Sequence, residues 1–285
     1  MNVSQAIRAA TAELTTSDDP FQRDTARRDA EYLMAHAMGC TRNEVLLRRM
    51  SDPAPDGFAA LVARRAAHEP VAYITGQASF WGLDLDVSPA VLIPRGDSET
   101  LIEAAQQAFA AWAPTRVLDL GTGSGCLLLA ALSLWPAAEG IGIERSDAAR
   151  AIATANVARH APAARILDGD WTRAGWAAGL GRFDLILANP PYVETGAALD
   201  PDVRDHEPAS ALFAGREGLD DYRRLVPQLP GLLAPGGVAV VEIGHTQANA
   251  VTQIGAAAGL VARMYRDLAG RPRALAFRWE TAGQQ

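Results

Sequence analysis

After about residue 115, apolar runs of strand length alternate with longer helical segments, and this alternation limits the fold more than any other feature. Strands are expected at 116–120, 140–144, 165–168, 183–188, 237–243, 261–266 and 275–279, and helices at 126–134, 147–160, 220–233 and 247–258. The pattern predicts an α/β fold with a doubly wound, mainly parallel sheet. The last two strands leave no room for a helix between them, so we expect an antiparallel hairpin at one edge.

The residues before this region predict two further parts. Residues 1–72 have only helical periodicity and predict a small all-α bundle, which either docks a partner or only adds stability. Residues 73–96 are expected to form a β-hairpin connector, because 80–87 alternates apolar and acidic side chains and 73–75 offers a second strand. Residues 97–285 then form the α/β domain, and Asp97 or Ser98 is expected to cap its first helix.

The charge of the chain excludes one class of protein. The net charge is −7 with a sequence pI near 5.3, and all 26 basic residues are arginine, so no basic surface is expected to wrap nucleic acid. The two cysteines and five histidines show no metal-ligand spacing. The chain also lacks a signal-like start and a continuous apolar run of ~18 residues, so we expect a cytoplasmic protein without a membrane span.

A glycine-rich loop follows the first strand of the α/β region. In Gly121-Thr122-Gly123-Ser124-Gly125, three glycines allow a tight turn and close approach to a ligand. A nicotinamide dinucleotide motif would place its third glycine at position 126, where this chain has Cys126. Asp119 is expected to place a negative charge beside the loop, which suits a cationic ligand.

Acidic and aromatic residues follow the next two strands. Glu144 ends the second strand and can accept hydrogen bonds from two ribose hydroxyls. Asp168 or Asp170 can accept from an adenine amine, and Trp171 can cover the ring. Each feature alone also fits an ordinary turn, helix cap or core residue. In this order, at the ends of strands one, two and three, they predict a site for S-adenosyl-L-methionine, whose sulfonium is the cation.

Asn189-Pro190-Pro191-Tyr192 follows the fourth strand, which the two prolines prevent from continuing. A carboxamide, two carbonyls and an aromatic ring suit a flat group with two N–H donors, such as an amide or an aromatic amine. The alternative is a proline-terminated strand that enters an ordinary loop. Strands one and four are neighbours in a doubly wound sheet, so this stretch and the glycine loop are expected to face one crevice.

These motifs resemble those of the PrmC (HemK) family of bacterial methyltransferases. The resemblance extends over nearly the whole chain, through 69–76, 80–83, 91–95, 98–99, 119–125, 189–192, 207–208, 218–220 and 267–273. Two positions differ from the family pattern. Gly96 stands where the family usually has proline, and Glu144 replaces a more usual Asp.

The resemblance implies a class I S-adenosylmethionine-dependent methyltransferase, with a Rossmann-like sheet of seven strands. It implies methylation of the glutamine side-chain nitrogen in the Gly-Gly-Gln loop of peptide chain release factors. Separately, we expect a monomer, and the acidic charge predicts no direct binding of nucleic acid. The implied cofactor contacts are Gly121, Thr122, Gly123, Ser124, Gly125, Glu144, Trp171 and Asn189. Asn189, Pro190, Pro191 and Tyr192 would bind the substrate, with Asn189, Pro190 and Tyr192 as the catalytic set.

Three rival functions remain open from the sequence. Asn-Pro-Pro-Tyr also occurs in enzymes that methylate the adenine amine of DNA, but those need a basic surface and a pocket for a flipped base. A related enzyme methylates a glutamine of a ribosomal protein, and local motifs separate it poorly from the release-factor enzyme. A non-catalytic scaffold would have no use for the acceptors at 189–192.

Overall fold

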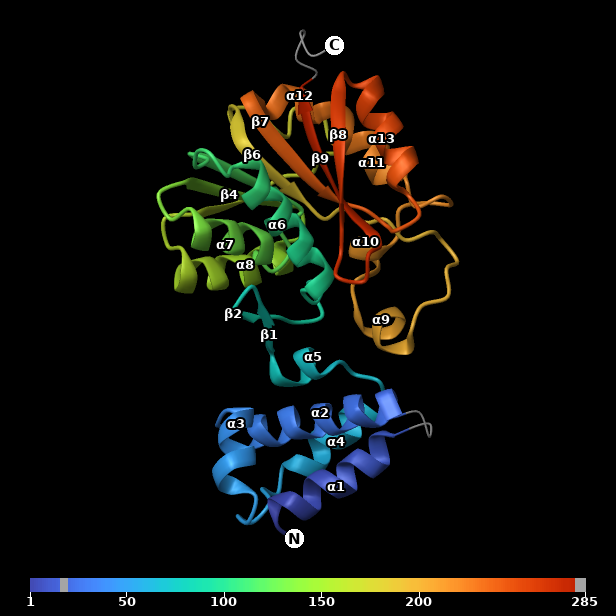
Figure 1. Ribbon diagram of the computed structural model, residues 1–285. Helices are drawn as coiled ribbons and strands as arrows, with labels where there is room; N and C mark the ends of the chain where they lie inside the picture. The colour runs from blue at the N-terminus through green and yellow to red at the C-terminus, as the bar shows by residue number, and fades with distance from the viewer. Residues whose placement is uncertain (16–19, 280–285) are drawn as a thin grey trace. The chain divides into compact units, whose positions relative to one another are not determined.

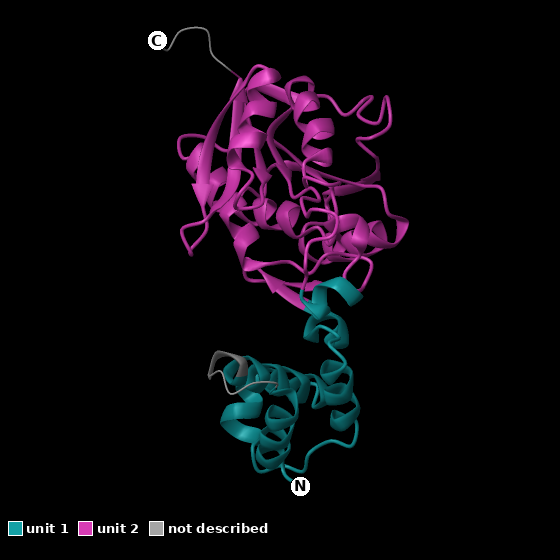
Figure 2. Cartoon of the chain, turned by 90° about the vertical axis from the view of Figure 1, so that its right-hand side faces the viewer, with its two compact units in different colours: residues 1–77, 200–206 teal, residues 78–199, 207–285 magenta. Residues whose placement is uncertain are grey.

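The computed structural model describes residues 1–15 and 20–279, which form two compact units (Figure 1, Figure 2). The first unit comprises residues 1–77 together with 200–206, and the second comprises residues 78–199 together with the chain from 207 onward. The predicted division into a bundle (1–72), a connector (73–96) and an α/β domain (97–285) concerns function, and it stays a prediction. Within the described residues, no helix combines the length and the apolar character that a membrane crossing requires.

The first unit is helical throughout. Its elements are α1 (Val3–Leu14), α2 (Pro20–Ala37), α3 (Arg42–Glu44), the π-helical turn η1 (Val45–Arg49), α4 (Phe58–Ala66), α5 (Val71–Thr75) and α9 (Pro201–His206). Side chains from α1, α2 and α4, among them Ile7, Leu33 and Val62, form one apolar core. The helical prediction for the amino-terminal region is therefore confirmed.

The β-hairpin differs from its prediction. Its strands are β1 (Gln77–Phe80) and β2 (Leu83–Asp86), and the turn between them lies inside the stretch expected to be one strand. Trp81 and Gly82 both have positive φ there, at 51° and 74°. The expected partner strand at 73–75 is wrong, because these residues end α5 and Ile74 packs into the helical core. Burial on a helix thus overrides the strand tendency of an apolar triplet.

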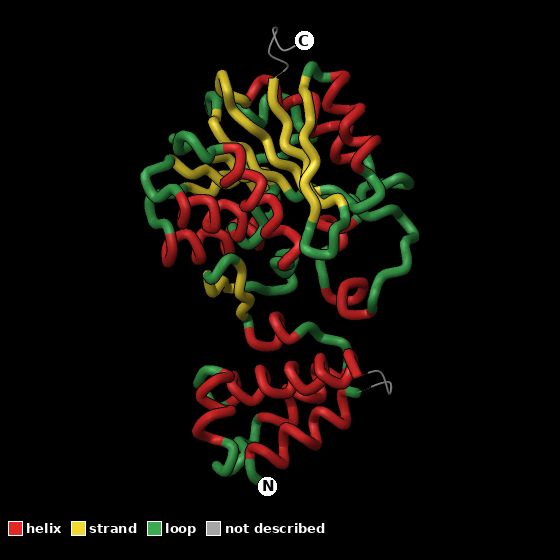
Figure 3. The backbone as a smooth tube through the Cα atoms, in the orientation of Figure 1, coloured by secondary structure: helices red, strands yellow, loops and turns green. Residues whose placement is uncertain are grey.

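The second unit is built on a seven-stranded sheet in the order β5-β4-β3-β6-β7-β9-β8 (Figure 3). The strands are β3 (Arg116–Leu120), β4 (Glu139–Glu144), β5 (Arg165–Asp168), β6 (Phe183–Ala188), β7 (Leu233–Glu242), β8 (Leu260–Arg266) and β9 (Pro272–Trp279). The first five run parallel, whereas β9 pairs antiparallel with both β7 and β8. The predicted doubly wound sheet with an antiparallel edge hairpin is confirmed.

Helices cover both faces of this sheet. They are the short 3-10 turn η2 (Gly96–Ser98), α6 (Glu99–Ala108), α7 (Cys126–Leu134), α8 (Asp147–His160), α10 (Ala209–Leu212), α11 (Asp220–Leu225), η3 (Val226–Gln228), α12 (Leu229–Leu232) and α13 (Ala248–Ala257). The single helix predicted at 220–233 is wrong. Pro227 and Pro230 lack the N–H groups that a continuous helix needs, and the segment divides into three short turns.

Successive side chains of the central strands enter two different cores. Val117 and Leu185 pack with α6 and α7 on one face, whereas Leu118 and Ile186 pack with α11 and η3 on the other. This period of two is the geometry of an extended strand. Because both faces are covered, the central strands are mostly apolar, and their ends are the positions best placed to present polar groups to a ligand.

Gly255 on α13 provides a test of this packing. A Cβ there would lie 2.3 Å from Phe277 Cε1 on β9, so Gly255→Ala should lower the free energy of unfolding by about 1–3 kcal/mol. Gly231→Ala is the matched control, since a Cβ on that helical residue meets nothing within 4 Å. The control should be neutral, or stabilising by up to about 1 kcal/mol. Urea denaturation followed by tryptophan fluorescence reports on this unit, because all 6 tryptophans lie in it. Equal stabilities of the two variants would contradict the packing.

Candidate active site

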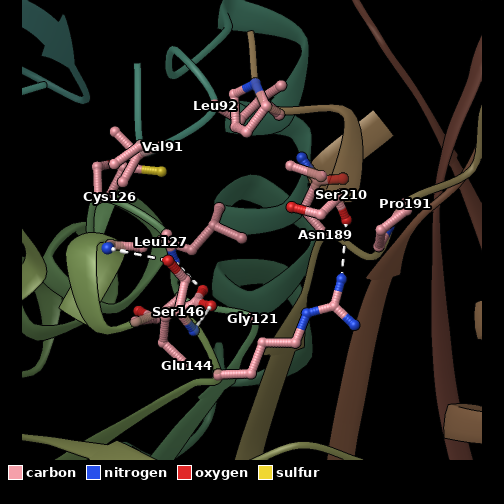
Figure 4. A pocket seen from close by; sticks show the side chains of 18 of the residues that line it. Val91, Leu92, Gly121, Cys126, Leu127, Glu144, Ser146, Asn189, Pro191 and Ser210 are labelled. Carbon is pink, nitrogen blue, oxygen red and sulfur yellow. Dashed lines mark hydrogen bonds between the residues drawn. The ribbon is translucent and has the colours of Figure 1, made fainter. Parts of the chain in front are cut away.

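A pocket lies at the carboxyl ends of β3, β4 and β6 (Figure 4). Its lining residues are 90–95, Ser98, 121–124, 126–127, 144–146, 149, 169–171, 189, 191, 208 and 210–211. The space that it encloses, including open solvent at its mouth, is about 960 Å³. Leu120 pairs with Ala188 in parallel register, and both Gly123 and Asn189 line the pocket. The prediction that the two loops face one crevice is confirmed.

The glycine loop is held at the end of β3 by its own backbone. Gly121 and Thr122 both donate their N–H to the Ile143 carbonyl, at 2.9 and 3.0 Å. Gly121 has φ of 72°, and a Cβ there would lie 2.9 Å from Trp171 Cη2. A side chain at position 121 would therefore collide with the aromatic wall. Gly125 is the N-cap residue of α7, with φ of 85°, and does not line the pocket.

The Glu144 carboxylate lies in the pocket wall and is fixed by two backbone groups. Gly123 N–H donates to its Oε2 at 3.1 Å, and Ser146 N–H donates to its Oε1 at 2.9 Å. A carboxylate offers about four lone-pair positions, so acceptor capacity remains for a ligand's hydroxyl groups. The predicted role toward a ribose stays a prediction that this geometry suits.

Trp171 forms the wall opposite Gly121. Its indole N–H donates to Asp221 Oδ1 at 3.1 Å, and its carbonyl accepts from Gln228 Nε2 at 3.0 Å. These bonds hold the half-buried ring beside the glycine loop. Asp170 also lines the pocket, whereas Asp168 is exposed and pairs with Arg150. Of the two acids considered for an adenine amine, only Asp170 is in place.

Asp119 does not present a charge to the pocket, contrary to expectation. Its carboxyl is buried, and its Oδ2 accepts from Thr122 Oγ1 at 2.5 Å and from Leu128 N at 3.3 Å. Burial raises the pKa of Asp119 to about 7. The group is thus only partly ionised near neutral pH, and it ties the glycine loop to the start of α7.

The Asn189–Tyr192 stretch leaves β6 along the opposite wall. Asn189 and Pro191 line the pocket, whereas Pro190 and Tyr192 are not among the lining residues. The Tyr192 hydroxyl donates to Glu242 Oε1 at 3.2 Å, and its carbonyl accepts from Gln247 Nε2 at 3.0 Å. The turn is therefore anchored from β7 and from the start of α13. The catalytic and binding roles predicted for these four residues stay predictions.

Three groups in or beside the pocket were not assigned from the sequence. The segment 90–95 forms part of the wall, although its sequence signal was only an apolar run that ends in Pro94. Arg145 donates from Nη2 to the Ser210 carbonyl at 3.1 Å, and both residues line the pocket. Ser98 is the N-cap residue of α6, one of the two positions expected, but its hydroxyl donates to the buried Glu242 at 2.5 Å rather than accepting from the helix backbone. Glu242 itself was not predicted from the sequence. The signal that could have identified it is a charged residue at the end of an apolar strand, because a buried charge is costly unless it is paired.

The lining fits S-adenosylmethionine. Trp171 supplies an aromatic surface, Glu144 and Asp170 supply acceptors, and Val91 and Leu127 supply apolar surface. Few polar groups among apolar ones are typical of a small-molecule site.

Comparison with known proteins supports the same conclusion. Residues 5–76 match the PrmC N-terminal domain, and residues 96–206 match the methyltransferase small domain. A release factor glutamine methyltransferase of Rhodospirillum rubrum is 42% identical over 265 residues, which cover 90% of this chain and 80% of that protein. One from Cereibacter sphaeroides is 41% identical, over 99% of this chain and 100% of that protein. The chain belongs to the release factor glutamine methyltransferase family.

Family membership confirms the predicted resemblance, the methyltransferase activity and S-adenosylmethionine as the cofactor of this enzyme. The fold agrees with a solved methyltransferase from Pyrococcus furiosus, at a TM-score of 0.52 and 19% identity over 75% of this chain and 95% of that one.

Asp119→Asn should change how the stability of this methyltransferase depends on pH. The carboxyl titrates near 3.9 in an unfolded chain and near 7 in the fold, so the folded state binds more protons between these values. Its contribution to stability is present below pH ~4 and is lost as the pH rises to about 7. The free energy of unfolding of the variant, measured relative to that of wild type, should therefore increase by about 1–4 kcal/mol as the pH rises from 4 to 8. Urea denaturation of the ligand-free enzyme across this range measures the gain, and a constant difference would contradict it.

Gly121→Ala should weaken cofactor binding. The new Cβ would push against the Trp171 ring and strain a backbone at φ of 72°, so the Kd for S-adenosylmethionine should rise at least roughly tenfold. Gly175→Ala is the matched control, because its φ is 78° but its Cβ meets nothing within 4 Å. Isothermal titration calorimetry should find an unchanged Kd for the control. Equal affinities for the two variants would rule out the aromatic wall as a binding surface.

Proposed function

We propose that this enzyme transfers a methyl group from S-adenosyl-L-methionine to the side-chain amide nitrogen of the glutamine in the Gly-Gly-Gln motif of peptide chain release factors. Membership of the family supports the substrate class. The observation that carries the proposal is the carboxamide of Asn189 in the same pocket as the glycine loop, at the ends of paired strands. Release factors act in translation, so the predicted cytoplasmic location belongs to the same proposal.

The chemistry explains why an acceptor set is needed. The lone pair of an amide nitrogen is delocalised into its carbonyl, with a rotation barrier of ~18–20 kcal/mol. In the proposed mechanism, the Asn189 side-chain oxygen and the Pro190 carbonyl each accept one N–H of the substrate amide. Holding both hydrogens fixes the nitrogen in one orientation and makes it more electron-rich. Tyr192 stacks on the amide plane.

S-adenosylmethionine supplies an electrophilic methyl group on its sulfonium. Glu144 would hold its ribose hydroxyls, and Trp171 with Gly121 would hold its adenine. The chain itself supplies orientation and electrostatic stabilisation. No general base is required before transfer, because the nitrogen becomes strongly acidic only as its bond to the methyl carbon forms and the sulfur–carbon bond breaks, after which its proton is lost to water. We therefore assign no catalytic histidine or glutamate.

The proposal also assigns a separate role to each of three segments of the chain. Residues 1–72 would dock the release factor, 73–96 would connect, and 97–285 would carry the chemistry. The family match to residues 5–76 supports a dedicated first domain. In that domain Tyr32 and Leu47 are 47% and 82% exposed, which suits a surface that contacts another protein. We further propose that the enzyme acts as a monomer without direct nucleic-acid contact, as its acidic charge favours.

Asn189→Ala tests the mechanism. Loss of an acceptor for the substrate N–H should lower kcat by roughly 10²–10³-fold, the range seen when one preorganised hydrogen-bonding group is removed from an active site. Cofactor affinity should change far less. Asn249→Ala, on the exposed surface of α13, is the matched control and should retain full turnover.

The assay offers labelled cofactor separately with a release factor, a ribosomal protein and duplex DNA, so that it also discriminates the rival substrates. Mass spectrometry should find one added methyl on the glutamine of the Gly-Gly-Gln peptide, and none when that glutamine is replaced by alanine. Near-normal methylation by Asn189→Ala would refute the mechanism. Labelling of DNA or of the ribosomal protein alone would refute the substrate.

A further inference from the structure

The carboxyl group of Glu242 is a buried charge beside the active site that the proposed transfer does not use. Glu242 ends β7 and is 2% exposed. Its Oε2 accepts from the Ser98 hydroxyl at 2.5 Å, and its Oε1 accepts from the Tyr192 hydroxyl at 3.2 Å. Burying a carboxylate is costly, so such a group is retained where its hydrogen bonds do something that an apolar residue cannot.

The direction of these hydrogen bonds can be followed to the active site. An ionised carboxylate only accepts, so the single proton of the Ser98 hydroxyl is directed at Glu242. The Ser98 oxygen can then only accept from its other neighbour. That neighbour is Asn189, whose Nδ2 lies 3.5 Å from Ser98 Oγ. The Asn189 amide therefore turns its donor toward Ser98 and leaves Oδ1 free to accept from a ligand in the pocket.

We propose that Glu242 is a positioning residue that sets, through Ser98, which atom of the Asn189 carboxamide faces the substrate. This inference rests on the proposed function, because the orientation matters only for a substrate with N–H donors. With Oδ1 inward, Asn189 accepts from the substrate amide. With the carboxamide reversed, Nδ2 would face a second donor, and the bond would be lost.

Two hydroxyl groups and two arginines surround the Glu242 carboxyl. Burial is the largest influence and leaves the pKa of the Glu242 carboxyl above its usual value, although the Ser98 hydrogen bond and the nearby charges of Arg273 and Arg95 favour the ionised form. Arg273 is itself held by Asp97 and Asp267, at 2.9 and 3.3 Å. The Tyr222 hydroxyl donates to the backbone carbonyl of Glu242 at 2.9 Å, so this anchor does not depend on the side chain. Side-chain substitutions at Glu242 can thus remove the carboxylate and leave the end of β7 anchored.

Three variants separate positioning from packing. Glu242→Met keeps the length of the side chain but removes the acceptor, so the Ser98 proton is released to point at Asn189 Oδ1. Its kcat for release-factor methylation should fall roughly 10–100-fold, with the KM for the release factor and the Kd for the cofactor within about threefold of wild type. Glu242→Gln can still present an oxygen to Ser98 and should restore kcat to within about fivefold. A packing role would be served as well by Met as by Gln.

Ser98→Ala removes the hydroxyl that links Glu242 to Asn189 and should lower kcat to a similar extent. The double variant Glu242→Met/Ser98→Ala should be no slower than the slower single variant, within about twofold. The reason is that both changes disrupt the same series of hydrogen bonds from Glu242 through Ser98 to Asn189. Asp184→Asn is the control, since Asp184 is a hydrogen-bonded carboxylate of the same unit that accepts from Thr115 and does not line the pocket. It should leave kcat unchanged.

An activity-independent measurement decides the orientation itself. In wild type, nuclear Overhauser contacts should join the Asn189 side-chain amide protons to Ser98, and Glu242→Met should lose them. If wild type transfers no methyl group to a release factor, the proposed function fails, while these contacts still test the orientation.

Two results would overturn the inference: wild-type turnover in both Glu242→Met and Ser98→Ala, or Asn189 amide contacts that Glu242→Met leaves unchanged. If Glu242→Met does not fold, Ser98→Ala decides by the same criteria.

Discussion

The parallel pairing of β3 with β6 is the interaction on which the site depends. It places Leu120 beside Ala188, so that the two chain segments that leave these strands begin next to each other. One is the glycine loop and the other is the Asn189–Tyr192 turn. Because both strands are buried on both faces, their ends are the only positions where this part of the sheet can present polar groups to a ligand. The crevice is a consequence of strand order rather than of either loop alone.

Around the crevice, the fold buries carboxyl groups in a way that an ordinary core avoids. Asp119 joins the glycine loop to α7, and Glu242 joins the Asn189–Tyr192 turn to Ser98. Each is costly to bury and accepts two hydrogen bonds. Deviations from the rule of an apolar interior concentrate where geometry must be exact for chemistry. In this enzyme Asp119 and Glu242 are two such deviations, one beside the glycine loop and one beside the Asn189–Tyr192 turn.

Much of the fold could be predicted from local signals. The strand at 183–188 agrees to the residue with β6, because apolar composition and Pro190 define its length and end. The glycine loop and Glu144 were predicted at the pocket because the residues after parallel strands share one edge of the sheet. Errors came where packing outweighed local pattern. The triplet 73–75 joined a helix, and Asp119 turned into the core rather than toward the ligand.

The sequence by itself determined the chemistry at each strand end, because strand length, proline and glycine act through neighbouring residues. The tertiary structure decided how these ends cooperate. Ser98 ends η2 directly before α6, Asn189 follows β6, and Glu242 ends β7. The hydrogen bonds of Ser98 with Asn189 and with Glu242 join residues 91 and 144 positions apart in the sequence. No local pattern specifies such a contact. It arises because the pairing of β6 with β7 and the packing of α6 against the sheet bring three distant side chains within reach of one another.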